Sequence, residues 1–116
     1  MAELKRAAIV GTGTMGPGMG AVLARAGIQT ALYDVSADAL ERAKTGVAMA
    51  DGALERLDAT KVDGGGISYE SDLATALAGC QLVIEAAPER LDLKQELFAE
   101  FERYVTPDAI LASNTS

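Results

Sequence analysis

The segment Gly11-Thr12-Gly13-Thr14-Met15-Gly16 constrains the fold more than any other part of this 116-residue chain. Its three glycines, in GxGxxG spacing, directly follow the apolar run 7–10, and a helical pattern begins near Thr14. A short apolar run that stops at glycine is typical of a strand buried on both faces. In a strand–turn–helix unit, Gly11 permits the tight turn, Gly13 admits a ligand close to the backbone, and Gly16 allows the helix to pack closely. This context predicts a phosphate-binding turn, whereas the glycine pattern alone is also common in loops that bind nothing.

Asp34 provides the second test of this interpretation. It lies 18 residues after Gly16, at the end of the next predicted strand, 30–33. An acid at about this distance accepts hydrogen bonds from an adenosine ribose, and its charge repels a 2′-phosphate. No arginine follows at positions 35 and 36, so the pattern predicts NAD rather than NADP. Asp34 could instead be a turn residue or part of a helix cap with Ser36. FAD-binding folds and glycine-rich methyltransferase loops share part of the pattern.

Helical and strand patterns alternate along the rest of the chain. Helices are predicted over about 14–26, from a cap at Ser36 to about 57, from a cap at Ser71 to Gly79, and over 91–104. Strands are predicted over 67–69, 82–86 and 109–112. The helix over 14–26 places its apolar residues on one face, and so does the helix over 91–104: Met15, Met19, Val22, Leu23 and Ala26 in the first, and Leu93, Leu97, Phe98 and Phe101 in the second. This order predicts an α/β fold, a Rossmann-type doubly wound parallel sheet, with residues 1–116 as a single domain.

Composition excludes several classes of partner. With 10 basic and 17 acidic residues the net charge is -7, which argues against nucleic acid or an anionic membrane as a partner. The one cysteine, Cys80, forms no internal disulfide and belongs to no metal-site pattern, so we expect a reducing, cytoplasmic setting and no metal. The apolar run 7–10 is too short for a signal or membrane segment. There is no histidine, so the commonest general acid or base is missing.

Three further segments carry a resemblance to a known family. They are Leu82-Val83-Ile84-Glu85-Ala86-Ala87-Pro88-Glu89, Leu93-Lys94-Gln95-Glu96-Leu97-Phe98 and Ala112-Ser113-Asn114-Thr115-Ser116. Together with the glycine-rich turn and Asp34, they resemble the N-terminal NAD-binding domain of L-3-hydroxyacyl-CoA dehydrogenases, over essentially the whole chain. Members of that family, which includes 3-hydroxybutyryl-CoA dehydrogenases, oxidise a 3-hydroxyacyl-CoA to the 3-ketoacyl-CoA and transfer the hydride to NAD.

The resemblance implies a set of site residues. Glu89 and Lys94 match family residues near the nicotinamide, and Ala87 lies on the loop that passes the cofactor. Asn114 matches a residue beside nicotinamide and substrate, and Ser116 matches the serine that contacts the 3-oxygen of the substrate. We therefore expect Ser116 and Asn114 to take part in catalysis. The expected cofactor-binding residues are Gly11, Gly13, Thr14, Met15, Gly16, Asp34, Ala87, Glu89, Lys94 and Asn114. Without the resemblance, the residues alone favour structural roles, with Glu89 as a first-turn acid of the following helix and Lys94 as a solvated surface residue.

The chain also departs from the family pattern. Acyl-CoA members often carry a longer, Lys-rich helical excursion between the second helix and Ser71, where this chain has Val62-Asp63-Gly64-Gly65-Gly66. The run 88–94 is similar to carnitine and other small hydroxyacid dehydrogenases of the same superfamily, which remain an alternative. A module that senses NAD(H) without catalysis is a third hypothesis. The family's His–Glu catalytic pair follows the serine matched by Ser116. We therefore expect the base, and a helical domain that forms a homodimer, to lie outside these 116 residues.

Overall fold

The computed structural model describes residues 4–13, 15–86, 99, 101 and 103–113. Five parallel strands form one sheet in the order β3-β2-β1-β4-β5. Their bounds are β1 Arg6–Val10, β2 Gln29–Tyr33, β3 Gly66–Glu70, β4 Leu82–Glu85 and β5 Ile110–Ser113. The described helices are α1 Gly16–Arg25, α2 Ala37–Arg56 and α3 Leu73–Leu77.

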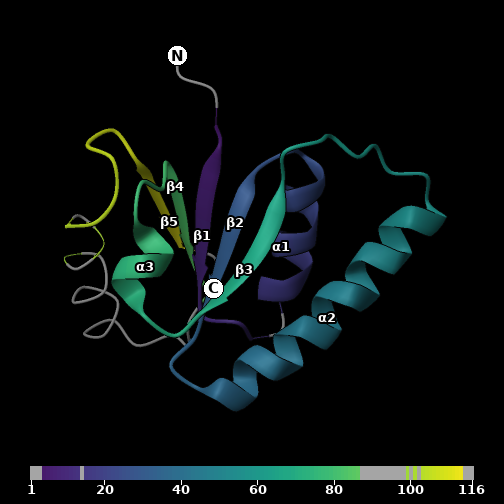
Figure 1. Cartoon of the computed structure of the whole chain (residues 1–116), viewed down its shortest axis with the longest axis horizontal. Coiled ribbons are helices and arrows are strands. Elements are labelled where there is room, and N and C mark those ends of the chain that lie inside the picture. Colours follow the sequence, from purple (N-terminus) through teal and green to yellow (C-terminus); the bar gives the residue numbers. More distant parts are fainter. Residues whose placement is uncertain (1–3, 14, 87–98, 100, 102, 114–116) are drawn as a thin grey trace.

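The helices cover both faces of the sheet. In Figure 1, α1 and α2 lie on one side of the strands and α3 lies on the other. The core is divided accordingly: Ala76 and Leu77 of α3 pack with Val10 and Val83, while Ala43 of α2 packs with Ile9 and Leu32. Central β1 is buried on both faces, with residues 7–10 at most 2% exposed. The predicted Rossmann-type doubly wound parallel sheet is therefore confirmed.

The predicted apolar face of α1 is only partly the buried one: Met19 and Leu23 pack, partly buried, against the cluster of Ile9 and Leu32. Met15 and Val22 are 58% and 54% exposed, and the residues of α1 that are buried are Gly16, Pro17, Gly20, Ala21 and Arg25. Small residues face the sheet because the helix lies very close to it: a Cβ on Gly20 would lie 3.4 Å from a methyl group of Leu32. The close approach of α1 to the sheet requires small residues on its most buried face. The larger apolar residues of the sequence pattern lie on a more exposed face of the helix.

Arg25 is buried although it is charged. Only 5% of the residue is exposed, and its Nε donates to Oδ1 of Asp51 at 2.8 Å. It also pairs with Glu55 and donates through Nη1 to the carbonyl oxygen of Ala59 at 3.0 Å. A buried guanidinium is tolerated when carboxylates and carbonyls satisfy its donors. Arg25 thus ties the end of α1 to the second half of α2 and to the segment after it.

The helix caps test two predictions. The hydroxyl of Ser36 accepts a hydrogen bond from the backbone N–H of Ala39, so the predicted cap of α2 is confirmed. The predicted cap of α3 at Ser71 is wrong, because the side chain of Asp72 accepts the N–H of Thr75 at 3.0 Å instead. Serine and aspartate are both good cap residues, and here they are adjacent, so the sequence pattern could not separate them.

Most of the predicted helix over 91–104 lies outside the described residues, including Leu93, Leu97 and Phe98. Phe101 is described and fully buried, packed in the cluster with Val83 and Leu77, as its inward position predicted. No helix in the described part of the chain has the length and apolar character needed to span a membrane.

Candidate functional site

The carboxyl ends of the parallel strands bring the predicted site residues to one edge of the sheet. Gly11 follows β1 and Asp34 follows β2, and Ala86, which was not a predicted site residue, follows β4. Backbone hydrogen bonds extend past the strand ends here: Gly11 N–H donates to Tyr33 C=O, and Ala86 N–H donates to Val10 C=O, both at 2.8 Å. Open α/β sheets bind ligands at this edge, beside the strand where the order reverses. In this sheet that strand is β1, which lies between β2 and β4.

The three glycines of the turn have the geometry that their predicted roles require. Gly11 has φ of +97°, a conformation that residues with a Cβ rarely adopt. A Cβ on Gly16 would lie 3.0 Å from the carbonyl oxygen of Gly11, so a side chain there would press on the backbone of the turn. At Gly13 the nearest atom to such a Cβ is the carbonyl oxygen of Ala86, 4.0 Å away. Gly13 therefore leaves space beside its backbone, on an exposed part of the turn.

The N-terminus of α1 differs from those of the other described helices. Side chains cap α2 and α3, but within the described residues no side chain caps α1, and its first turn contains no acid. The first N–H groups of a helix lack partners inside the helix and carry partial positive charge. An anion such as a pyrophosphate satisfies such groups. The turn therefore fits the pyrophosphate of a dinucleotide.

Asp34 is held from two sides. Its Oδ2 accepts hydrogen bonds from Thr12, at 3.2 Å from the backbone N–H and 2.9 Å from the hydroxyl, and its Oδ1 accepts the N–H of Ser36 at 3.0 Å. Partial burial raises the pKa of the Asp34 carboxyl, but the hydrogen bonds from Ser36, Thr12 and Val35 outweigh it and leave the pKa below its ordinary value. Asp34 is thus ionised at neutral pH and fixed beside the glycine-rich turn.

The contacts of Asp34 confirm one of the two hypotheses that the sequence left open, the turn before α2, and the ribose role stays a prediction. The bond from Ser36 makes Asp34 part of the turn before α2, as the cap hypothesis expected. The bonds from Thr12 connect the same carboxylate to the glycine-rich turn, 22 residues earlier. Thr12 was not predicted as a functional residue. The only feature of the sequence that could have indicated it is its position between the first two glycines of the motif.

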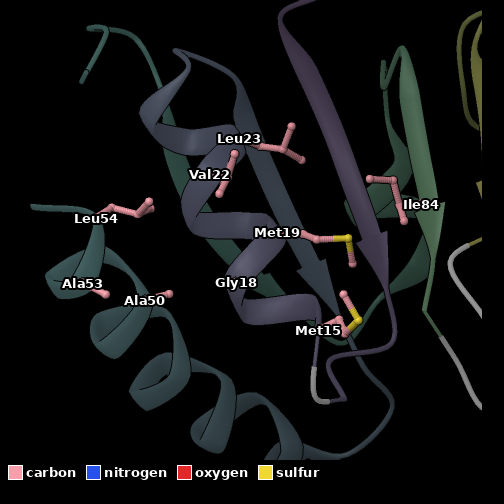
Figure 2. A pocket seen from close by; sticks show the side chains of 9 residues that line it. All are labelled: Met15, Gly18, Met19, Val22, Leu23, Ala50, Ala53, Leu54 and Ile84. Carbon is pink, nitrogen blue, oxygen red and sulfur yellow. The ribbon is translucent and has the colours of Figure 1, made fainter. Parts of the chain in front are cut away.

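Met15 lies at the N-terminal end of α1 and lines an apolar groove with a volume of about 620 Å³. Figure 2 shows Met15, Met19 and Leu23 pointing from α1 towards the side on which Ile84 of β4 lies. The other lining residues are Gly18 and Val22 of α1 and Ala50, Ala53 and Leu54 of α2. Met15 therefore lies between the glycine-rich turn and an open apolar groove. Its contact with the cofactor stays a prediction.

The remaining predicted site residues lie outside the described part of the chain. They are Thr14, Ala87, Glu89, Lys94, Asn114 and Ser116. Their roles remain predictions. Among the described residues, no group of three or more histidine, cysteine, aspartate or glutamate side chains could hold a metal ion.

A parallel sheet in this order, a glycine-rich turn before a helix and an ionised aspartate after β2 define a dinucleotide-binding domain of the Rossmann type. The family model described as 3-hydroxyacyl-CoA dehydrogenase, NAD binding domain, matches residues 6–116. The chain belongs to this family, whose cofactor is NAD, so the predicted family and cofactor are confirmed.

Three similar enzymes illustrate the range of the family. A 3-hydroxyadipyl-CoA dehydrogenase of Escherichia coli is 39% identical over 127 residues, covering 100% of this chain and 25% of its own length. An L-carnitine dehydrogenase of Streptomyces griseus is 36% identical over 115 residues, covering 98% and 34%. A 5-formyl-3-hydroxy-2-methylpyridine 4-carboxylate 5-dehydrogenase of Mesorhizobium japonicum is 37% identical over 115 residues, covering 97% and 37%.

A crystal structure of an enzyme with this last name, described as an NAD+ dependent dismutase, superposes with a TM-score of 0.92 at 37% identity. It covers 98% of this chain and 38% of the other. This chain therefore spans well under half the length of each of these relatives.

Proposed function

We propose that this chain is the part of an NAD-dependent dehydrogenase that binds and orients the cofactor. The observation that carries the proposal is the ionised carboxylate of Asp34, tied to the glycine-rich turn by Thr12. Asp34 would accept the hydroxyl groups of the adenosine ribose, while the backbone at Gly13 and the N-terminus of α1 would receive the pyrophosphate. When bound, NAD supplies the hydride acceptor, and the protein supplies binding and orientation.

The proposed reaction is oxidation of an alcohol next to the nicotinamide. By resemblance, Glu89, Lys94 and Ala87 lie near the cofactor, Asn114 lies beside nicotinamide and substrate, and Ser116 contacts the reacting oxygen. Asn114 directly follows Ser113, the last residue of β5, whose carboxyl end belongs to the same edge as those of β1 and β4. Removing the hydroxyl proton needs a base with a pKa near neutrality, and the chain contains no histidine. We therefore propose that the base comes from outside these residues.

The first candidate substrate is a 3-hydroxyacyl-CoA. The family description supports it, as does the similarity to the 3-hydroxyadipyl-CoA enzyme. In this account the 3-hydroxyl group is oxidised to a ketone and the hydride passes to NAD. The rest of the protein would close over the substrate and form a homodimer, as the resemblance implies. We also propose a cytoplasmic setting, since Cys80 is a free, buried thiol.

The second candidate is a small hydroxy acid that is not a CoA ester, and one observation favours it. The similarity to the CoA enzyme extends over 127 residues against 116 in this chain, so that relative carries extra residues in the matched region. The matches to the carnitine and pyridine carboxylate enzymes extend over 115 residues. The segment after α2 is also short and tightly packed in this chain. Val62 N–H donates to Arg25 C=O at 2.7 Å, and Gly65 leaves no room for a Cβ beside the carbonyl of Ala24.

The complete product of the gene distinguishes these candidates. NADH oxidation would be followed with acetoacetyl-CoA and, separately, with 3-dehydrocarnitine, each against a Ser116→Ala variant. Turnover with acetoacetyl-CoA that Ser116→Ala abolishes supports the acyl-CoA assignment. Turnover with 3-dehydrocarnitine alone supports the second candidate. NAD binding without turnover of any 3-keto acid or its CoA ester would contradict both and leave an NAD(H)-sensing module.

A further inference from the structure

Thr12 contributes two hydrogen bonds to a single oxygen atom. Its backbone N–H and its hydroxyl both donate to Oδ2 of Asp34, at 3.2 Å and 2.9 Å. The residue is only 5% exposed, so this hydroxyl is largely shielded from water that could replace the carboxylate as its partner. Hydrogen bonds to an ionised acceptor are stronger than those between neutral groups. The pair therefore fixes the rotation of the Asp34 side chain from the side of the glycine-rich turn.

The two oxygens of Asp34 consequently have different surroundings. Oδ2 accepts two donors from Thr12, which matches the two lone pairs of one carboxylate oxygen. Among the described residues, Oδ1 accepts one hydrogen bond of defined geometry, from the N–H of Ser36, so it is the less fully bonded of the two oxygens. An incoming ribose hydroxyl would thus meet a carboxylate whose orientation is already set, with Oδ1 as its acceptor. Binding to a preorganised group loses less entropy than binding to a rotating one.

We propose that Thr12 is a positioning residue for cofactor recognition: its hydroxyl holds Oδ2 of Asp34 so that Oδ1 is presented to the adenosine ribose of NAD. This rests on the proposed function, because it presumes that Asp34 contacts the ribose. It assigns a role to the variable position between the first two glycines of the motif. Cofactor preference then depends on the hydroxyl of Thr12 as well as on the charge of Asp34.

The chain contains a control with the same hydrogen-bond pattern, at an exposed threonine. Thr75 donates through its backbone N–H and its hydroxyl to Oδ2 of Asp72, at 3.0 Å and 2.6 Å, in the cap of α3. Removing either hydroxyl therefore makes the same chemical change at the same kind of threonine–aspartate pair. Only the pair formed by Thr12 and Asp34 involves a residue of the glycine-rich turn, Thr12. Thr12→Val and Thr75→Val therefore separate cofactor positioning from a general effect of losing such a bond.

The test is calorimetric titration of NAD into the 116-residue chain and its variants. We expect Thr12→Val to weaken NAD binding about two- to tenfold, because the Asp34 side chain would then lose its rotational freedom only when NAD binds. Thr12→Ser, which keeps the hydroxyl, should retain near-normal affinity for NAD. Thr75→Val should leave the affinity for NAD unchanged. Chemical denaturation of each variant identifies any that fails to fold. If Thr12→Val does not fold, the NAD affinities of Thr12→Ser and Asp34→Asn are compared instead.

The dependence of NAD affinity on pH provides a second measurement, which a purely structural role of Thr12 would not change. The hydroxyl of Thr12 is one of the donors that lower the pKa of Asp34. Its removal should raise that pKa, so NAD affinity in Thr12→Val should begin to fall at a higher pH than in the wild type. Asp34→Asn should weaken NAD binding throughout; if it does not, the proposed function itself fails. If Asp34→Asn does weaken binding, two results would overturn the role of Thr12. One is that Thr12→Val binds NAD at least as tightly as the wild type, and the other is that Thr12→Ser binds as weakly as Thr12→Val.

Discussion

A Cβ atom on Gly16 would lie 3.0 Å from the carbonyl oxygen of Gly11, so the first residue of α1 is in contact with the first residue of the turn that precedes it. Backbone cannot move aside as a flexible side chain can. We therefore expect Gly16→Ala to lower the free energy of unfolding by about 1–3 kcal/mol, as overpacking in a tight interior does. Urea denaturation measures this change.

Gly18→Ala is the matched control for that prediction. A Cβ at Gly18 would meet no atom within 4 Å, and the residue lies in the same helix. Alanine is favoured over glycine in a helix, so this variant should gain up to about 1 kcal/mol. Equal effects of the two substitutions would contradict the close contact between α1 and the turn.

The cap of α2 gives a second prediction. The hydroxyl of Ser36 accepts the N–H of Ala39 at 3.2 Å, so Ser36→Ala should cost about 1 kcal/mol of stability. Ser71 is exposed and precedes the actual cap of α3, Asp72. Ser71→Ala should therefore leave the denaturation midpoint unchanged. A loss at Ser71 as large as that at Ser36 would contradict the assigned caps.

Asp34 should make stability depend on pH in a defined direction. Its pKa in the folded protein lies below the ordinary value because the hydrogen bonds from Ser36 and Thr12 outweigh burial. A carboxyl with a lowered folded pKa stabilises the protein at pH values above its unfolded pKa of about 4, and this contribution is lost as the pH falls towards the folded pKa. The wild type should therefore exceed Asp34→Asn in stability at pH 7, and the difference should shrink below pH 4. A difference that grows on acidification would contradict the assigned contacts.

The chain alone should bind NAD without efficient catalysis. It contains no histidine, and the candidate bases that the resemblance implies near the reaction centre are Glu89 and Lys94. With NADH and acetoacetyl-CoA, we expect turnover far below the ordinary range of about 1–1000 per second. Absorbance at the NADH band measures it. Turnover within that range would show that these residues contain a complete active site.

The sequence predicted the parts of the fold that depend on periodicity and special backbone geometry. The buried strand at 7–10, the turn at Gly11 and the acid at Asp34 are visible because each requires a narrow choice of residue. The most buried residues of α1 were missed because several of them are glycine and alanine, which a hydrophobic pattern does not mark, whereas Met19 and Leu23 of the predicted face do pack against the core. The bonds between Thr12 and Asp34 join residues that only the sheet brings together.

The burial of Arg25 was also beyond sequence reasoning. A lone arginine near a helix end predicts a solvated side chain. Its partners Asp51 and Glu55 lie one turn apart on another helix, and only the packing of α1 against α2 brings them to the guanidinium.

The central claim is that Asp34, beside the glycine-rich turn, selects NAD. The most direct test is calorimetric titration of NAD and of NADP into the wild-type chain and into Asp34→Ala. We expect the wild type to bind NAD much more tightly than NADP, because the carboxylate accepts the ribose hydroxyls and repels a 2′-phosphate. In Asp34→Ala the two affinities should approach each other. Equal or tighter binding of NADP by the wild type would contradict the account.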